Sequence, residues 1–252
     1  MRNIRLIARL DVKAPNLVKG IQLEGLRKLG DPNTFAKKYY QEGIDEIYFE
    51  DIVASLYERN SLVGIIKRTT ENVFVPITVG GGLRNIDDIS SALRSGADKV
   101  SINTAALKNP EIIKKAARRF GSQAIVLSIQ AKRNENGWEA YFDNGREHSG
   151  IDAVDWASEG EQLGAGEILV TSVDKEGMAK GFDCELIKEI SSNVSIPVIA
   201  SGGMGKLEHL SDVVIQGCAD AVAMAHVLHY DIITLNEIRD YASKEGIPVR
   251  NI

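Results

Sequence analysis

Two short glycine-rich segments have the residue types and spacing to bind an anion. They are VGGGLRN (79–85) and ASGGMGK (200–206), and each follows an apolar run and precedes a helical pattern. Glycines at such a junction let backbone N–H groups approach an anion, and the start of a helix adds partial positive charge. Either cluster alone could be a tight turn. Two clusters in equivalent positions, each followed by another strand end at SINTAA (101–106) and AMAHVL (223–228), predict a substrate with a phosphate at each end.

Acidic side chains at the ends of apolar runs are candidates for acid–base chemistry. Asp11 ends the first run, and Gln130 ends the fifth; Asp51 and Glu176 reach the same face. A loop cap, or a salt bridge with Lys19, is the alternative for Asp11. The four histidines form no HxH or HExxH pair, and only His226 lies at a strand end near a glycine loop. We therefore expect neither a metal nor a cofactor.

Four charged residues lie near the opposite ends of these runs, where a buried core does not explain them. They alternate in sign and lie near the starts of the first, second, fourth and sixth runs, at Arg5, Glu46, Lys99 and Glu167. In equivalent places they could form a closed ring of ion pairs across one end of a barrel. Ordinary solvation of strand starts is the alternative.

The elements that must position these residues alternate regularly along the chain. Eight β-branched apolar runs, typical of buried parallel strands, are separated by amphipathic stretches. The runs cover 4–11, 45–51, 73–79, 98–103, 123–130, 167–173, 196–201 and 220–225. Eight such units in 252 residues predict one α/β domain over 1–252, a (β/α)₈ TIM barrel. A doubly wound open sheet is the alternative.

An internal repeat divides this barrel into two halves. Gly43 and Gly164, Pro76 and Pro197, Gly81 and Gly202, and Gly96 and Gly217 are each separated by 121 residues. We therefore predict two half-barrel repeats, at about 1–121 and 122–252. Asp98 corresponds to Asp220, so the second half has one extra residue near Cys218. The segment 132–150 breaks the pattern and contains two Asn-Gly pairs, which predict an inserted hairpin.

Composition excludes several classes of protein. The net charge of −5 lacks the basic face that nucleic-acid binding needs. No uncharged apolar stretch approaches the length of a membrane span. Two cysteines without CxxC spacing fit a reducing compartment, so we expect a cytoplasmic protein without membrane or nucleic-acid partners.

Several of these segments together resemble the cyclase subunit of imidazole glycerol phosphate synthase. The resemblance runs from residue 4 to residue 250 and includes LDVKAPNLVKG (10–20), VGGGLRN, GADKVSINTAA (96–106), GAGEILVTSVDKEG (164–177) and PVIASGGMGK (197–206). It implies a lyase of histidine biosynthesis. A separate glutaminase would dock on the N-terminal face, and ammonia would cross the barrel. At the other face it would react with a bis-phosphorylated ribulosyl aminoimidazole carboxamide ribotide.

The resemblance also assigns roles to individual residues. Asp11 matches the first catalytic aspartate, and Asp98 matches a residue of the glutaminase interface. The ring of four charges matches the gate of the ammonia channel. The phosphate sites correspond to Gly81, Gly82, Asn103 and Thr104, and to Gly202, Gly203, Ala225 and His226. The substrate face comprises Lys19, Asp51, Thr171, Glu176 and Gly177.

Departures from the family pattern fall on the substrate face. Gln130 replaces the second catalytic aspartate, and an amide has no titratable proton. Losing an acid–base group typically slows a reaction about 10²–10⁴-fold. Met178, Glu176 and His226 are further departures. The pattern resembles a paralogue group of lipopolysaccharide biosynthesis, in which the barrel passes ammonia toward sugar amidation by an N-acetyl sugar amidotransferase. That role is the leading interpretation. An authentic cyclase is the alternative, and the sister isomerase of the pathway, which needs no glutaminase, is a second alternative.

Overall fold

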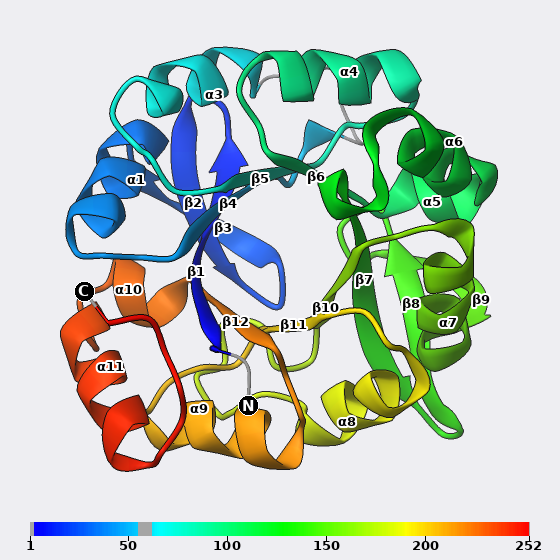
Figure 1. Cartoon of the computed structure of the whole chain (residues 1–252). Coiled ribbons are helices and arrows are strands. Elements are labelled where there is room, and N and C mark those ends of the chain that lie inside the picture. Colours follow the sequence, from blue (N-terminus) through cyan, green and yellow to red (C-terminus); the bar gives the residue numbers. More distant parts are fainter. Residues whose placement is uncertain (1–2, 55–61, 252) are drawn as a thin grey trace.

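A closed ring of eight parallel strands forms the centre of the molecule (Figure 1). The computed structural model describes residues 3–54 and 62–251, so the domain limits predicted at residues 1 and 252 lie outside it. The ring runs through β1 (Arg5–Lys13), β4 (Glu46–Asp51), β5 (Ile77–Gly80), β6 (Lys99–Ile102), β7 (Ile125–Asn134), β10 (Glu167–Ser172), β11 (Val198–Ser201) and β12 (Ala221–Met224). It closes through pairing of β7 with β10 and of β12 with β1. The predicted (β/α)₈ barrel is confirmed, and the open sheet is excluded because the ring has no edge.

Helices cover the outside of the ring (Figure 1). They are α1 (Pro32–Gln41), α3 (Val63–Thr70), α4 (Ile86–Arg94), α5 (Thr104–Lys108), α6 (Glu111–Phe120), α7 (Ala153–Leu163), α8 (Cys184–Asn193), α9 (Glu208–Ser211), α10 (His226–His229) and α11 (Leu235–Lys244). A large apolar core fills the layer between helices and strands, and a smaller one fills the barrel interior around Ile7, Tyr48 and Leu169. In the described part of the chain, no helix has the length and apolarity to cross a membrane.

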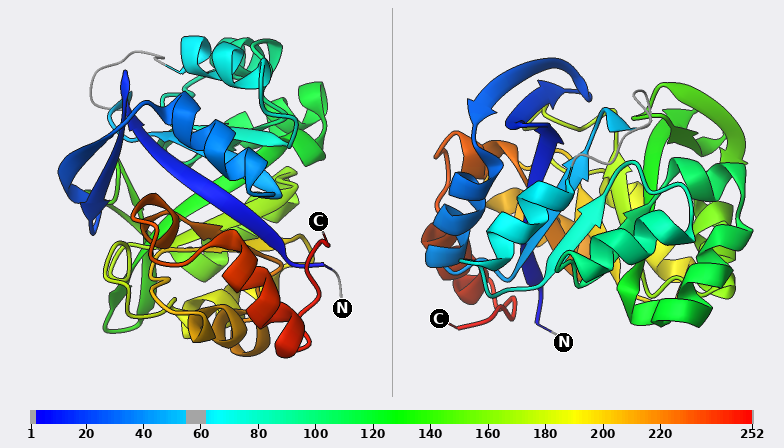
Figure 2. Two further views of the ribbon diagram at one scale, coloured as in Figure 1. Left: turned by 90° about the vertical axis from the view of Figure 1, so that its left-hand side faces the viewer. Right: turned by 90° about the horizontal axis from the view of Figure 1, so that it is seen from above.

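Two β-hairpins stand at one end of the barrel, and both chain termini lie at the other (Figure 2). The predicted insertion is present: β7 continues to Asn134 and pairs with β8 (Gly137–Phe142), which pairs with β9 (Glu147–Asp152). The other hairpin, formed by β2 (Asn16–Ile21) and β3 (Glu24–Gly30), was not predicted from the sequence. The strand ends that were expected to bind substrate therefore lie at the end with the hairpins.

The β2–β3 hairpin was missed because its turn lacks the usual sequence signal. Gln22 and Leu23 connect the strands, and both have a left-handed backbone, with φ of 50° and 65°. Two-residue turns of this kind normally contain Asn or Gly. Here contacts with a distant loop replace that preference, since the Gln22 N–H donates to the carbonyl oxygen of Glu176 at 2.8 Å. Tertiary structure rather than local propensity holds this turn.

Equivalent hydrogen bonds recur in the two predicted half-barrels. The carboxylate of Asp98 accepts from the backbone N–H of Ile77 at 2.8 Å, and that of Asp220 accepts from Val198 at 3.0 Å. The extra residue of the second half lies next to a π-helical turn over Asp212–Gln216. A π turn takes up one residue more than an α turn. The N–H of Gly217 accordingly bonds the carbonyl of Asp212, five residues earlier. These features support the half-barrel interpretation, which remains a prediction.

Candidate functional site

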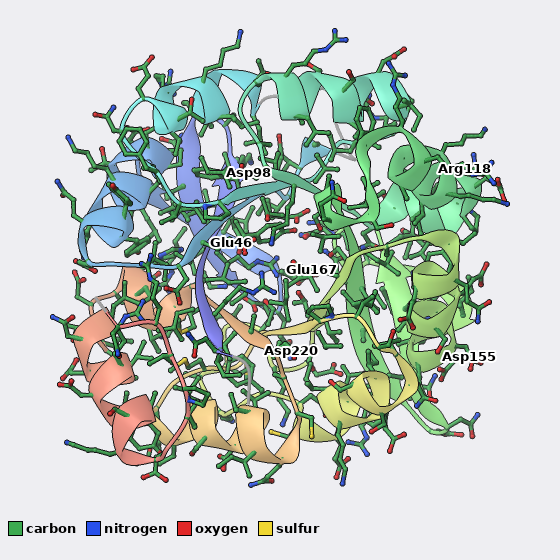
Figure 3. The ribbon with its side chains drawn as sticks, viewed as in Figure 1. Glu46, Asp98, Arg118, Asp155, Glu167 and Asp220 are labelled. Carbon is green, nitrogen blue, oxygen red and sulfur yellow. The ribbon has the colours of Figure 1, made fainter. Side chains whose placement is uncertain are left out.

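Four alternating charges close the N-terminal end of the barrel, and we call them the floor ring: Arg5, Glu46, Lys99 and Glu167. Arg5 pairs with Glu46 at 2.8 Å and with Glu167 at 3.1 Å. Lys99 pairs with the same two carboxylates at 3.0 and 2.9 Å. Glu46 and Glu167 point toward the centre of the ring of strands (Figure 3). Each charge therefore has two opposite neighbours, as the spacing along the sequence predicted.

The floor ring is partly removed from water, which makes its pairing important. The side chain of Glu46 is only 3% exposed and that of Lys99 is 14% exposed. An unpaired charge in such a place costs several kcal/mol, so breaking any pair of the floor ring would destabilise the protein. Asp98 lies beside the ring at the start of β6 and is exposed (Figure 3).

A cavity of about 350 Å³ opens at the other end of the barrel, and we call it the C-terminal pocket. Six predicted site residues contribute to its wall: Asp51, Gly81, Gly82, Asn103, Thr104 and Gln130. The first glycine loop lies against β4, because a Cβ atom on Gly81 would come within 2.2 Å of the carbonyl oxygen of Asp51. Gly81 and Gly82 also have φ of 86° and 72°, a backbone that favours glycine.

Two amide side chains in the pocket wall have carbonyl oxygens without hydrogen-bond donors among the described residues. They are Asn103 Oδ1 and Gln130 Oε1, and both are buried. Asn103 Nδ2 donates to the carbonyl of Tyr141 at 3.1 Å, and Thr104 Oγ1 accepts from the N–H of Asp143 at 3.1 Å. The inserted hairpin thus fixes this wall of the pocket, and polar atoms remain available to a ligand.

Two cations at the pocket were not identified from the sequence. Arg84 and Lys108 both contribute to its wall. Lys108 is 58% exposed, pairs with Asp143 at 3.6 Å and lies over the ring of Phe142. Arg84 belongs to the first glycine-rich segment, VGGGLRN, although the glycines alone did not single it out. Lys108 belongs to neither a glycine cluster nor a strand end, so only its place in the fold brings it here. Both favour an anionic ligand.

Removing the charge of Lys108 tests the anion-binding role of this pocket. We expect Lys108→Ala to weaken inorganic phosphate binding about 3- to 10-fold, since one partly screened charge near a surface contributes about 1 kcal/mol. The loss should shrink at high ionic strength. Isothermal titration measures both effects. Lys114→Ala is the control, because Lys114 is a half-buried lysine on α6 that pairs with Glu111 and is not part of the pocket wall. Equal phosphate affinity in the two variants would contradict the assignment.

The second glycine loop borders a space of only about 10 Å³. Gly202, Gly203, Ala225 and His226 surround it, as does Glu176. The carboxylate of Glu176 lies 3.0 Å from where a Cβ atom on Gly202 would be, and it accepts a hydrogen bond from Lys19. The spaces beside the two glycine loops therefore differ in volume, and Glu176, which pairs with Lys19, borders the smaller one. The second phosphate site remains a prediction.

A buried network of charges lies beneath this ion pair. Arg9 donates from Nε to Asp11 Oδ1 at 2.9 Å and from Nη1 to Thr171 Oγ1 at 2.8 Å and Ser201 Oγ at 3.1 Å. Lys19 Nζ is 3.9 Å from the other oxygen of Asp11. Asp11 is 2% exposed and is not part of the pocket wall. The predicted substrate face is thus divided, with Asp51 and Gln130 at the pocket and Asp11, Lys19, Thr171, Glu176 and Gly177 near the second loop.

Opposite effects act on two neighbouring carboxyl groups, Asp11 and Glu50. Burial alone raises the pKa of Asp11, but the cations Arg9 and Lys19 outweigh it and hold the pKa below its ordinary value. Burial raises the pKa of Glu50 to about 8, and neighbouring Asp11 and Asp51 add to the rise. Arg9 and Glu50 were not identified from the sequence. The sequence did contain a signal for them. Side chains alternate between the two faces of a strand, so Arg9 faces the same side as Arg5, and Glu50 the same side as Glu46.

Comparison with known proteins shows the family to which this TIM barrel belongs. Residues 5–234 match the family described as "Histidine biosynthesis protein". An imidazole glycerol phosphate synthase subunit HisF of Legionella pneumophila is 65% identical over 212 residues, which cover 84% of this chain and 100% of that protein. HisF of Methanocaldococcus jannaschii is 48% identical over 98% of both chains. The chain therefore belongs to the HisF family of histidine biosynthesis proteins.

Within the described residues, no group of three or more His, Cys, Asp or Glu side chains could hold a metal ion. His226 lines the second loop, whereas His229 is buried and hydrogen-bonds the hydroxyl of Tyr39 at 2.7 Å. His209 accepts from the N–H of Gly205 at 3.1 Å, and His148 contacts Tyr141 on the inserted hairpin. The histidines are therefore dispersed over separate structural contacts.

Proposed function

We propose that this chain is the cyclase subunit of an imidazole glycerol phosphate synthase and works with a separate glutaminase. The two relatives named as HisF subunits support this activity, and neither supports the sugar-amidation role that the substitutions suggested. The subunit would combine ammonia with the bis-phosphorylated ribotide at the C-terminal pocket. Its products would be imidazole glycerol phosphate and the aminoimidazole carboxamide ribotide.

The floor ring is the observation that carries the proposal. It crosses the barrel axis at the end opposite the C-terminal pocket, so a molecule that passes through it reaches the pocket by way of the barrel interior. Ile7, Tyr48, Val126 and Leu169 make this interior mainly apolar. An ammonium ion would lose hydration there without a counter-charge, whereas neutral ammonia would lose far less. The ring would therefore admit ammonia and exclude ammonium.

The glutaminase would dock around the floor ring. Asp98 is exposed there, and its hydrogen bond to the Ile77 N–H fixes its carboxylate at the start of β6. A rigid carboxylate beside the channel mouth suits recognition of a donor group on the partner. Because β6 ends at Ile102, next to Asn103 in the pocket wall, a contact at Asp98 is also connected to the ligand site at the other end.

Sugar amidation is a second candidate because two observations distinguish this pocket from a symmetric bis-phosphate site. Gln130 supplies an amide where a titratable group is expected, and the space beside the second glycine loop, bordered by Glu176, is small. A barrel that only conducted ammonia would need neither an acid–base group at position 130 nor an open second loop. The acceptor would then be an N-acetyl sugar bound to a partner amidotransferase.

Turnover by the isolated subunit separates the two candidates. The purified chain would receive an ammonium salt and the bis-phosphorylated ribotide, and imidazole glycerol phosphate would be measured by mass spectrometry. The proposal predicts steady multiple turnover without any glutaminase. No product above the level of a heat-inactivated sample would favour the amidation candidate.

A further inference from the structure

Two carboxyl side chains lie next to each other on neighbouring barrel strands. Asp11 and Glu50 are direct partners in the parallel pairing of β1 with β4, so both point into the barrel at the same height. Glu50 is 9% exposed and contributes to the wall of the C-terminal pocket, together with Gln130. A Cβ atom on Gly80 would be 2.4 Å from Glu50 Oε2, which places this carboxyl beside the first glycine loop.

The charges of the buried network are already balanced without Glu50. Arg9 donates to Asp11, Thr171 and Ser201, and Lys19 pairs with Glu176. Two cations thus face two anions. Among residues 3–54 and 62–251, no side chain donates a hydrogen bond to Glu50. Asp51 is also buried and lies next to Glu50. An ionised Glu50 would add a further negative charge beside Asp11 and Asp51, and burial among like charges favours the protonated form.

Asp11 and Glu50 have different surroundings, which shift their pKa values in opposite directions and so determine which of the two is the acid. Arg9 and Lys19 stabilise the ionised form of Asp11, whereas burial and the adjacent Asp11 and Asp51 favour the neutral form of Glu50. Such pairs are a recurrent way to keep one carboxyl ionised and the other protonated at neutral pH. The neutral member here is the one that borders the pocket.

We propose that Glu50 is the proton donor and acceptor of the C-terminal pocket, with Asp11 as its ionised neighbour, and that it supplies the titratable group that Gln130 lacks. The inference rests on the proposed reaction of ammonia in this pocket. It assigns the acid–base role to a different strand, β4 in place of β7. A pair of carboxyl groups, Glu50 in the pocket wall and Asp11 next to it, is thereby kept, and Gln130 need only provide an oxygen that accepts a hydrogen bond.

The proton balance of ammonia addition can be completed by one such group. As the ammonia nitrogen bonds a carbonyl carbon of the substrate, neutral Glu50 donates its proton to the carbonyl oxygen. The resulting carboxylate then accepts a proton from the positively charged nitrogen. A second transfer of the same kind releases the oxygen as water and leaves a C=N bond. Glu50 ends protonated, so no oxidant, reductant or further reactant is required.

The charged and titratable groups around Glu50 set the pH dependence. They come from β1, β2, β4 and the loop after β10, and they are Arg9, Asp11, Lys19, Tyr48, Asp51 and Glu176. The facing side chain from β7, Gln130, does not titrate. Because Glu50 ionises with a pKa of about 8, the acid form is lost above that pH. Turnover with ammonia held constant should therefore fall on the alkaline side with an apparent pKa near 8.

The test compares the unchanged protein with Glu50→Gln in turnover of the bis-phosphorylated ribotide and an ammonium salt. We expect Glu50→Gln to lose about 10²–10⁴-fold in turnover number and to lose the alkaline limb near pH 8. Inorganic phosphate should still bind. Glu50→Gln with Gln130→Asp should regain at least about tenfold, since a titratable group returns to the pocket. Glu189→Gln is the matched control, because Glu189 is exposed on α8 and should show none of these effects.

Two measurements on Glu50 itself do not depend on turnover. An infrared difference spectrum between Glu50→Gln and the unchanged protein should contain the band of a protonated carboxyl at pH 7. Melting temperatures provide the second. The folded protein holds Glu50 protonated up to about pH 8, whereas the unfolded chain ionises near its ordinary value of 4.5. The unchanged protein therefore loses stability as the pH rises from about 4.5 to about 8. Glu50→Gln has no proton to lose there, so its melting temperature should exceed that of the unchanged protein by an amount that grows with pH.

The outcomes separate the inference from the proposed function. An active protein whose Glu50 is ionised at pH 7, or whose Glu50→Gln variant keeps full turnover and the same pH profile, would overturn the role of Glu50 alone. No turnover by the unchanged protein at any pH would overturn the proposed function and the role of Glu50 with it.

Discussion

Replacing Lys99 by alanine should separate glutamine hydrolysis from product formation. Lys99 bridges Glu46 and Glu167 at 3.0 and 2.9 Å, so its loss opens one side of the floor ring. Water can then enter at the channel mouth, and ammonia can escape or take up a proton before it crosses the barrel. We expect glutamate formed to exceed imidazole glycerol phosphate formed by several-fold, instead of the near-equal amounts expected of an intact channel. Paired assays of both products in the complex with the glutaminase measure the ratio.

The stability of this variant needs to be followed in parallel. Glu46 and Glu167 each keep Arg5 as a partner, at 2.8 and 3.1 Å, so neither carboxylate is left unpaired. Removing one member of a buried ion pair costs about 3–5 kcal/mol, and the remaining pairing with Arg5 should keep the loss below that range. Lys99→Arg, which keeps the charge, and Lys114→Ala, which lies away from the floor, are the controls. A glutamate-to-product ratio unchanged in Lys99→Ala would contradict the gating role.

The second large effect should come from Asp11→Asn. Asp11 is the ionised carboxyl beside Glu50, and its charge helps to keep Glu50 protonated. Glu50 is the proposed acid–base group, and such groups contribute about 10²–10⁴-fold to a rate. We expect a loss of that size in turnover with ammonium salt. Inorganic phosphate binding should change little, because Asp11 is not part of the pocket wall.

The direction of the pH shift distinguishes this explanation from simple damage. The negative charge of Asp11 raises the pKa of Glu50, whereas Arg9 lowers it. Asp11→Asn should lower the pKa of Glu50 in two ways. The negative charge that raised this pKa is gone, and Arg9, which lowers it, is no longer neutralised by an ion pair with Asp11. The alkaline limb of the remaining activity should therefore move below pH 8. A limb that stays in place, or moves upward, would show that Asp11 and Glu50 are not coupled.

Part of this site follows directly from residue spacing. Strand starts in a parallel barrel lie at one level, so four alternating charges at strand starts had to meet when the barrel closed. The glycines at 81 and 82 likewise predict a tight loop with positive φ angles. The structure has this loop, and Gly81 packs closely against Asp51 at the end of β4.

Other parts depend on packing that spacing does not specify. The second glycine loop repeats the first in sequence, yet the space next to it is far smaller and is bordered by Glu176, which pairs with Lys19. Lys19 is delivered by the β2–β3 hairpin, whose turn has no glycine or asparagine and was therefore not predicted. The positions of Arg9 and Glu50 follow from the same period of two that placed Arg5 and Glu46. A role for Glu50 becomes evident only from the ion pairs. Asp11 pairs with Arg9 and Glu176 with Lys19, whereas Glu50 forms no ion pair within the described residues.

The most direct test of the account follows the origin of the nitrogen in the product. The complex of this chain with its glutaminase would receive glutamine labelled with ¹⁵N at the amide, the bis-phosphorylated ribotide and an excess of unlabelled ammonium salt at pH 7. The nitrogen isotope in imidazole glycerol phosphate would be measured by mass spectrometry. Conduction through the floor ring predicts product that carries almost entirely ¹⁵N, with the label diluted in Lys99→Ala. Product labelled to the same extent as the ammonium in solution, or no imidazole glycerol phosphate at all, would contradict the account.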